Sequence, residues 1–452
     1  EEAAMGEAGS KCGGKGRKDD EGEKAAMLHQ HHGKRVAETI EDGDHEPLSR
    51  STGRANTGYF GIAALVTQTI LTSLFFFTGY DLTSLTVFNS SQAYDFYVGI
   101  GVMLFVGFGY LNTFLKCYGL SSIGFTMFIG CLGIQWALLL QGWMGTGQFR
   151  LAFNVVSFIR ANQSVAAVLV SFGAVLGKTS PLQILVLVMI EMVCVTVNKI
   201  YIMDKLGVMD IGGTMSVHVF GAFFGLFLSF CSAPRNSKNS KGDKVFAPNE
   251  DEFGSTYTSD ILAMLGTVFM WLFWPCFNGG DLTMGTAQQK MAIMNTVFAL
   301  CGSTVTTFAM STLCTKQQRL TTSPIQMATL AGGVAVGAVA NFAVLPGGAV
   351  LIGMGGGAIS TCSFLWLHNV LEDKWDTTGV MSLHGIPGLF GAVVSIFLPL
   401  FVKTVPIEAG KQALGLLCVT VNAIICGSVT GYVLAYSGKQ PAVAYNDEAY
   451  WD

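Results

Sequence analysis

The sequence predicts an all-α polytopic membrane protein with twelve transmembrane helices and an inverted repeat of two five-helix units. The composition is the first observation: 51% of the 452 residues are hydrophobic and only 12% are charged, which is typical of membrane proteins. Twelve apolar runs of spanning length are the second. The third is a motif that occurs twice, at the heads of two runs predicted to cross the bilayer in opposite directions.

Each of the twelve runs approaches the roughly 20 apolar residues that cross a hydrocarbon core about 30 Å thick. Residues 1–58 precede them and are rich in charge and glycine without apolar periodicity, so we predict a disordered cytoplasmic tail. A short cytoplasmic tail, 437–452, follows the membrane domain, 59–436. The runs lie near 59–80, 95–115, 121–144, 164–180, 182–203, 212–232, 259–278, 290–313, 326–345, 347–368, 378–402 and 413–436.

The distribution of basic residues predicts the orientation. Of the 26 lysines and arginines, 19 lie in the N-terminal tail and the segments on its side of the membrane, and 7 lie on the other side. Because basic residues favour the cytoplasmic side, both termini of this multi-pass protein are predicted in the cytoplasm. The plasma membrane is the expected location, although the basic residues do not bear on it. The net charge of -4 gives no reason to expect binding to nucleic acid.

The repeated motif is DIGGTMSVHVFGAFFG at 210–225 and DTTGVMSLHGIPGLFG at 376–391, with seven identical positions. The copies open the sixth and eleventh runs, which are five apart and therefore antiparallel, as in transporters with inverted repeats. In each copy an Asp precedes a His by eight residues, which is roughly 12 Å along an α-helix. We therefore predict that His218 and His384 lie near the membrane midplane and meet there.

Ionisable side chains inside a membrane usually mark function. Two neutral imidazoles can share a hydrogen bond and still offer a donor and an acceptor to a passing solute. The alternative is a pair of structural core histidines, which the matched Asp–His spacing disfavours. Asp210 and Asp376 have two open interpretations: each caps the positive end of its helix, or each also favours a cation near a pore.

Two further features are open to more than one interpretation. Glu191 lies in the middle of a run and is either a proton relay or, as we favour, a hydrogen-bonded structural carboxyl. Phe277 lies in the aromatic segment 270–279, which is typical of a membrane-interface belt; the alternative is that Phe277 obstructs a pore mouth.

No cofactor, metal site or enzymatic activity is predicted. His29, His31 and His32 form a short cluster, but such clusters in polar tails are usually solvated. The chain also lacks an HExxH pair and a nucleophile elbow. An intramembrane enzyme is therefore the least favoured alternative.

Several stretches together resemble the Rh glycoprotein branch of the ammonium transporter superfamily over residues 59–436. The resemblance implies the ammonium transporter fold, with eleven helices in a five-plus-five repeat preceded by an extra first helix. It also implies a homotrimer that conducts ammonia/ammonium, with one hydrophobic pore per subunit lined by twin histidines. The stretches are FVGFGYLNTFLKCYGLSSIGF (105–125), GIQWALLLQGW (133–143), FGAVLGK (172–178), GTMSVHVFGAFFGL (213–226), MLGTVFMWLFWPCFN (264–278), ATLAGGVAVG (328–337) and DTTGVMSLHGIPG (376–388).

The resemblance assigns roles to the motif residues. His218 and His384 match the twin histidines, Asp210 and Asp376 match the paired aspartates, and Phe277 matches one phenylalanine of the outer gate. It therefore implies that these five residues line or support the pore.

Other positions match the family less closely. Gln163 occupies the position of the second gate phenylalanine, and Lys199 stands where an acidic residue of the outer mouth is expected. Asn278, directly after Phe277, is also assigned to the pore. Asp260 matches an acidic residue of the inner vestibule, and Asn89, in the predicted first outer loop, is a candidate glycosylation site.

Two other activities remain alternatives to ammonia/ammonium conduction. The same fold with an altered gate is compatible with a channel for carbon dioxide. A non-conducting membrane scaffold is the other alternative, and the presence of both histidines argues against it.

Overall fold

The computed structural model describes residues 50–82, 87–232, 253–316, 318–371, 375–403, 405–438, 441 and 444–451, without the side chains of 50–57, 87–90 and 368–369. Nearly all of the predicted N-terminal tail, including His29, His31 and His32, lies outside these residues. The first helix begins at Arg50, inside the predicted tail. All elements beyond that residue belong to one compact unit, Ser51–Asp452.

Eleven helices in the described residues are long and apolar enough to cross a membrane, judged by length and composition, and they coincide with eleven of the twelve predicted runs. The all-α polytopic fold is thus confirmed. The spanning segments are Gly58–Phe75, Ser91–Phe114, Gly119–Thr146, Val155–Ala174, Pro181–Asp204, Thr214–Ser232, Tyr257–Gly279, Ala287–Leu313, Pro346–Leu367, Met381–Phe401 and Ala409–Tyr436.

Several of the spans change helix type along their length; in the labels used here η marks a 3-10 or π-helical segment. The elements of the first half are α2 Arg50–Phe75, β1 Thr78–Tyr80, α3 Val87–Val102, η1 Met103–Phe108, α4 Gly109–Leu111, η2 Asn112–Phe114, α5 Gly119–Thr146, β2 Leu151–Phe153, α6 Val155–Ala174, α7 Pro181–Val197, η3 Asn198–Asp204, η4 Thr214–Val219 and α8 Phe220–Ser232. Those of the second half are α9 Tyr257–Gly279, α10 Ala287–Leu313, α11 Thr322–Met327, η5 Ala328–Leu330, α12 Ala331–Val336, η6 Gly337–Val339, α13 Pro346–Cys362, η7 Ser363–Leu367, α14 His368–Leu371, η8 Met381–Gly385, α15 Ile386–Phe401 and α16 Ala409–Tyr436.

The ninth predicted helix, 326–345, forms as the segment α11–η6, residues 322–339, which is helical throughout but alternates between α- and 3-10-helix, so that its α-helical hydrogen bonding is broken. It nevertheless crosses the fold, because the helices on either side of it are parallel: Gly353 of α13 lies against Ala299 of α10, and Gly357 lies against Ser303. The chain must therefore return between them. A side-chain hydrogen bond from Ser303 to the carbonyl of Ala328 fixes the antiparallel position of the segment.

The break is stable in an apolar surround because side chains from other elements satisfy the exposed backbone groups. Thr214 of η4 bridges the broken turn, since its Oγ1 donates to the carbonyl of Val334 over 2.7 Å and accepts from the N–H of Ala338 over 2.7 Å. The carbonyls of Gln326, Gly333 and Ala340 accept from Thr267, Asn278 and Asn295, respectively. The break is thus a specific structure rather than a frayed helix.

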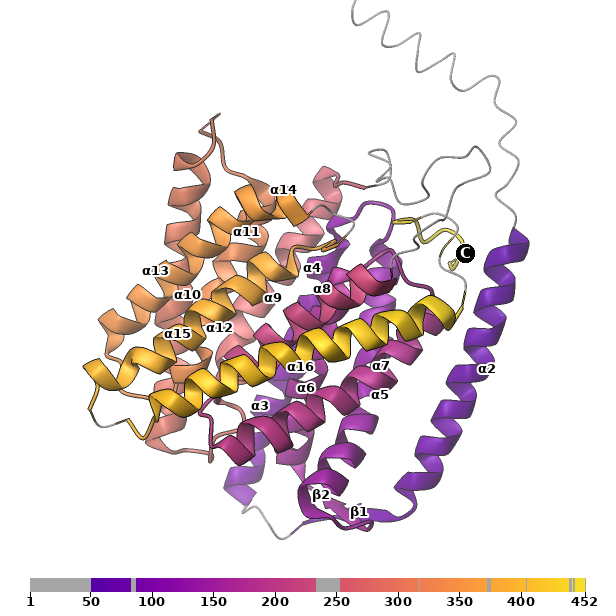
Figure 1. Cartoon of the computed structure of the whole chain (residues 1–452), viewed down its shortest axis with the longest axis horizontal. Coiled ribbons are helices and arrows are strands. Elements are labelled where there is room, and N and C mark those ends of the chain that lie inside the picture. Colours follow the sequence, from indigo (N-terminus) through magenta and orange to yellow (C-terminus); the bar gives the residue numbers. More distant parts are fainter. Residues whose placement is uncertain are drawn as a thin grey trace, which may run out of the picture. The chain divides into compact units, whose positions relative to one another are not determined.

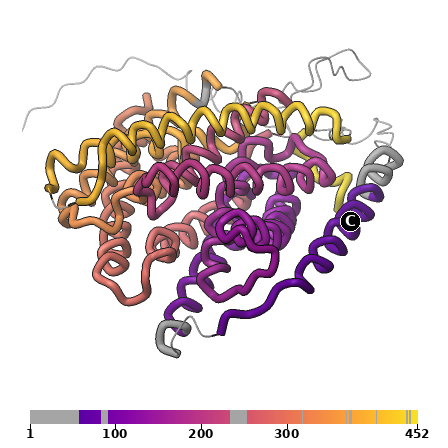
Figure 2. The backbone as a smooth tube through the Cα atoms, turned by 60° about the horizontal axis from the view of Figure 1, so that its bottom comes forward, coloured from indigo at the N-terminus to yellow at the C-terminus, as the bar shows by residue number. Residues whose placement is uncertain are grey.

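Two helices differ in how closely they join the bundle. Both views show α2 standing apart from the other helices (Figure 1, Figure 2), and only 6% of its spanning window is buried. Its side-chain links to α5 include reciprocal hydrogen bonds between Gln68 and Gln135. By contrast, α16 runs as one long helix along α8 (Figure 1) and makes extensive contacts with it. The helix added before the repeat is thus the least integrated one.

The predicted C-terminal tail does not leave the membrane domain where it is described. Tyr445 is buried, and its N–H donates to the carbonyl of Gly177 over 2.8 Å. The carboxylate of Asp447 accepts from the N–H of Ser121 at the start of α5, and Trp451 donates to the hydroxyl of the same serine. This segment therefore holds together the turns at one end of α5 and α6.

Candidate functional site

The two copies of the repeat form the same local structure at the centre of the fold. A glycine with left-handed backbone opens each one: Gly213 has φ 68° and Gly379 has φ 74°. Each glycine is followed by a π-helical segment, η4 or η8, that contains the histidine. The inverted repeat predicted from the sequence thus extends to an uncommon backbone conformation.

The paired aspartates cap these segments. Asp210 accepts hydrogen bonds from the N–H groups of Met215 and Ser216 and from the hydroxyl of Ser216. Asp376, which is fully buried, accepts from the N–H groups of Val380 and Met381. The sequence analysis placed the start of each helix at its Asp, and this was wrong. A turn separates each Asp from its π-helical segment, so the distance from Asp to His is not that of eight α-helical residues.

The histidines meet at the centre of the fold, as their spacing predicted. The Nδ1 atoms of His218 and His384 are 3.1 Å apart, and the rings are nearly parallel, with centroids 5.1 Å apart and an interplanar angle of 12°. Both side chains are buried, with 1% and 2% of their surface exposed. The Nε2 atom of His218 has no hydrogen-bond partner among the described residues.

The two rings have different neighbours. His218 packs against Trp274 and Phe277 of α9, at centroid distances of 5.6 and 5.9 Å. His384 stacks on Phe108 of η1 at 6.0 Å. On the side of His384 there is a small cavity, lined by Phe108, Leu111, Asn112, Leu169, Val170, Gly173, Met327, Thr378, Val380, Leu383 and His384.

The sequence analysis missed two of these aromatic neighbours, Trp274 and Phe108. Trp274 lies one helical turn before Phe277 on α9, and this spacing was a usable signal. Its indole N–H is buried without a partner among the described residues. Phe108 is distant in sequence from both copies of the motif and gave no such signal.

Gln163 and Phe277 are in direct contact. The side-chain Nε2 of Gln163 donates to the carbonyl of Phe277 over 3.0 Å, and both residues are buried. Asn278, assigned to the pore from the sequence, instead points into the packing between helices, where it donates to Thr296 and to Gly333. Its observed contacts are therefore those of a residue that supports the broken segment.

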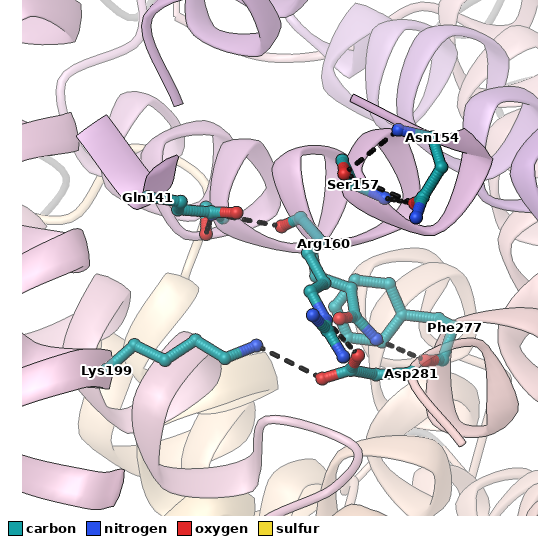
Figure 3. Close-up of polar contacts among 9 residues, drawn as sticks. Gln141, Asn154, Ser157, Arg160, Lys199, Phe277 and Asp281 are labelled. Atoms are coloured by element: carbon teal, nitrogen blue, oxygen red, sulfur yellow. Dashed lines mark hydrogen bonds and ion pairs between the residues drawn. The ribbon is translucent and has the colours of Figure 1, made fainter. Parts of the chain in front are cut away.

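A cluster of charged residues, which we call the charged mouth, lies at the end of α9 beyond Phe277. Asp281 is ion-paired with Arg160 of α6 and with Lys199 of η3 (Figure 3). Burial raises the pKa of the Asp281 carboxyl, but Lys199 and Arg160 together outweigh burial and hold that pKa below its usual value. The sequence analysis identified Lys199 but not its partners.

The remaining candidate residues have described contacts with residues other than the two histidines. Glu191 is buried and accepts a hydrogen bond from Ser171. Asp260 lies in the first turn of α9 and accepts from Ser255 and Gln326. Asn89 lies in the first turn of α3 rather than in a loop, and its side chain is outside the described part of the structure.

Two inverted halves that meet at a buried pair of polar side chains define a membrane protein built as a transporter or channel. The chain belongs to the Ammonium Transporter Family, whose model matches residues 59–448, and within it to the Rh branch. It is 36% identical over 386 residues to the ammonium transporter Rh type B of Rattus norvegicus, covering 79% of this chain and 83% of the relative. The Rh type C transporter of Oryctolagus cuniculus is 36% identical over 383 residues, with 79% and 80% covered.

Solved structures agree with this assignment. The Rh50 channel of Nitrosomonas europaea superimposes with a TM-score of 0.72 at 32% identity, covering 81% of this chain and 93% of that one. Mep2 of Saccharomyces cerevisiae superimposes with a TM-score of 0.62 at 20% identity, covering 77% and 85%, and so shows the shared fold alone.

Proposed function

We propose that the protein conducts ammonia/ammonium across the membrane through a hydrophobic pore that passes the twin histidines. The contact between the Nδ1 atoms of His218 and His384 over 3.1 Å carries this proposal. In the same proposal Gln163 and Phe277 form the gate between the charged mouth and His218. Asp210 and Asp376 hold the two histidine segments in place through their backbone hydrogen bonds.

The shared hydrogen bond determines what the pair offers to a solute. One Nδ1 must donate and the other must accept, so in the neutral pair one Nε2 is an acceptor and the other carries a proton. Ammonia has both a lone pair and N–H groups and is able to use either edge. A pair of neutral imidazoles thus suits a small neutral molecule that both donates and accepts.

The apolar surround favours the neutral species. Phe108, Trp274 and Phe277 pack around the histidines, and an ion that loses its hydration shell among such side chains faces a cost of several kcal/mol. Ammonium avoids this cost when it gives its proton to water outside the pore and enters as ammonia. Potassium has no proton to give, so the pore rejects it.

The assembly and the location are part of the same proposal. We expect a homotrimer with one pore per subunit in the plasma membrane, with both termini in the cytoplasm, so that the charged mouth faces outward. Chemical crosslinking in native membranes, with accessibility labelling of Lys205 against Lys316 from either side, tests the assembly and the orientation.

The decisive experiment is stopped-flow measurement of internal pH in liposomes that contain the purified full-length protein, under an inward ammonia gradient. Wild-type protein should alkalinise the lumen faster than empty liposomes. His218→Ala and His384→Ala should each change the rate about tenfold, because a lost hydrogen bond to the solute changes its free energy in the pore by about 1.4 kcal/mol.

Thr420→Ala on α16 is a matched control, since the hydroxyl of Thr420 donates, among the described residues, to the carbonyl of Leu416 in its own helix, and it should conduct like wild type. Wild-type rates equal to those of empty liposomes, with insertion shown by protease protection, would contradict the proposal. A carbon dioxide gradient that the protein collapses faster than an ammonia gradient would favour a carbon dioxide channel instead.

A further inference from the structure

The charged mouth contains a carboxylate whose two oxygens are both occupied by cations of the chain itself. Asp281 Oδ1 pairs with the guanidinium of Arg160, and Asp281 Oδ2 lies 3.4 Å from the ammonium nitrogen of Lys199. Three elements supply these groups: α6, η3 and the turn after α9. Figure 3 shows Arg160 and Lys199 reaching Asp281 from different ribbons.

The cluster lies directly beside the gate of the proposed pore. Arg160 precedes Gln163 by about one turn of α6, and Asp281 follows Phe277 by four residues. The ion pair between Arg160 and Asp281 and the hydrogen bond between Gln163 and Phe277 are therefore two successive links between the same two segments. A solute that approaches Phe277 from this end passes the cluster.

The charges of this mouth are balanced. The side chains of Arg160, Lys199 and Asp281 are 52%, 31% and 16% exposed, so the carboxylate is the most buried of the three. Asp204 also interacts electrostatically with all three groups. Two cations thus face two carboxylates. Asp210, the other carboxylate near Lys199, already accepts hydrogen bonds from Met215 and Ser216.

The side chain of Lys199 ends in an alkylammonium group, which binds a carboxylate through charged N–H donors as an ammonium ion would. We propose that Lys199, with Arg160, is a tethered counter-cation that occupies Asp281, so that this mouth does not bind ammonium and admits uncharged ammonia. A tethered group acts at an effective concentration on the order of millimolar. Free ammonium at lower concentrations competes poorly with it.

This inference rests on the proposed conduction of ammonia/ammonium, and it makes Lys199 a determinant of specificity. Removing the tethered ammonium leaves Asp281 with one open oxygen beside the gate. The mouth then becomes a site for a small cation with N–H donors. The guanidinium of Arg160 stays on the other oxygen and keeps the carboxylate in place.

Methylammonium is a suitable probe, because it is an alkylammonium ion of nearly the same chemistry as the end of the lysine side chain. We would measure its binding to the purified protein by calorimetry and its competition with ammonia-driven alkalinisation in liposomes. Lys199→Gln should lower the half-saturating methylammonium concentration about tenfold, the gain expected from one new charged contact. Added salt should reduce this gain.

Two further variants test whether the gain comes from the direct contact between Lys199 and Asp281 or from the loss of one positive charge anywhere near the mouth. Lys205→Gln removes a charge from the segment that follows Lys199, but Lys205 lies over the ring of Tyr201 at 4.8 Å and not at Asp281, so it should leave the half-saturating concentration unchanged. Lys199→Gln with Asp281→Asn should abolish the gain. An equal gain in Lys205→Gln, a gain that survives Asp281→Asn, or no gain in Lys199→Gln would each overturn the inference.

The outcome for the proposed function is separate. If wild type alkalinises liposomes no faster than the lipid alone, the proposed conduction fails whatever the variants do. If wild type conducts and Lys199→Gln binds methylammonium no better, only the role of Lys199 fails. The calorimetric readout does not depend on conduction, so it tests the site even in a protein that conducts nothing.

Discussion

The two copies of the repeat share a backbone but not an environment. In both, an Asp caps a π-helical segment that begins after a left-handed glycine and presents a histidine. His218 faces Trp274 and Phe277, whereas His384 faces Phe108 and a small cavity. The repeat therefore fixes where the histidines lie, and residues outside it determine what each one meets.

The caps differ in the same way. Asp376 is fully buried, whereas Asp210 is partly exposed and also accepts a hydrogen bond from the hydroxyl of Ser216. The matching Ser382 bonds instead to Ser363. Equivalent residues of an inverted repeat thus contribute unequally, and substitutions made in pairs measure how unequal they are.

Among the paired substitutions, those of the two aspartates should differ most in how much they lower the free energy of unfolding. Asp376→Ala leaves the N–H groups of Val380 and Met381 buried without acceptors and should lower the free energy of unfolding by about 3 kcal/mol. Asp210→Ala should cost about 1 kcal/mol, because water reaches a partly exposed cap. Thermal unfolding in detergent measures both. The Asp→Asn variants, which keep one acceptor oxygen, are the controls, and equal losses in the two Ala variants would contradict the asymmetry.

Substitutions of the two glycines should differ less in their effect on the free energy of unfolding. Any side chain at Gly213 or Gly379 is strained by the positive φ, at about 1 kcal/mol. A Cβ at Gly379 would also lie 2.4 Å from the ring of Phe364, whereas at Gly213 its closest contact is the side chain of Val217 at 2.7 Å, with the ring of Phe277 at 3.8 Å. Gly379→Ala should thus lose about 2 kcal/mol and Gly213→Ala about 1. The result to watch for is the reverse order, which would show that Phe364 moves aside freely.

Much of this arrangement was predictable from local pattern. Hydropathy identified eleven continuous spans, and the matched positions of the two motifs predicted the contact between His218 and His384. Asp210 and Asp376 were recognisable as caps, because an Asp followed by glycine at the head of an apolar run is a local signal. These features depend on residues close together in sequence or on a repeat visible in the chain.

What escaped prediction depends on distant partners. The segment 326–345 is as apolar as a helix, and its break is stable only because Thr214, Asn278 and Ser303 of other elements satisfy its backbone. Arg160 and Asp281 are 121 positions apart, so their ion pair left no trace in the sequence. The docking of Tyr445 and Asp447 had no local signal either.

The smallest effect on stability is expected for the carboxylates at the two ends of the proposed pore, Asp281 and Asp260. Asp281 is held by two cations, whereas the described contacts of Asp260 are with the neutral side chains of Ser255 and Gln326. The ion pairs of Asp281 are partly exposed, so Asp281→Asn should cost less than 1 kcal/mol, and 1 M salt should reduce that cost. Asp260→Asn should show no such salt dependence.

The pH dependence follows from the direction of the pKa shift. The pKa of Asp281 is lower in the folded protein than its usual value of 3.8, so the stability that its charge provides is fully present above about pH 3.8 and is lost as the pH falls through the folded pKa. The difference in melting temperature between wild type and Asp281→Asn should therefore stay constant from pH 5 to pH 8 and shrink below about pH 4. A difference that changed between pH 6 and pH 8 would mean that Asp281 is not held between its two cations. The carboxylate of Asp281 is thus expected to stay charged throughout the range in which ammonia and ammonium interconvert.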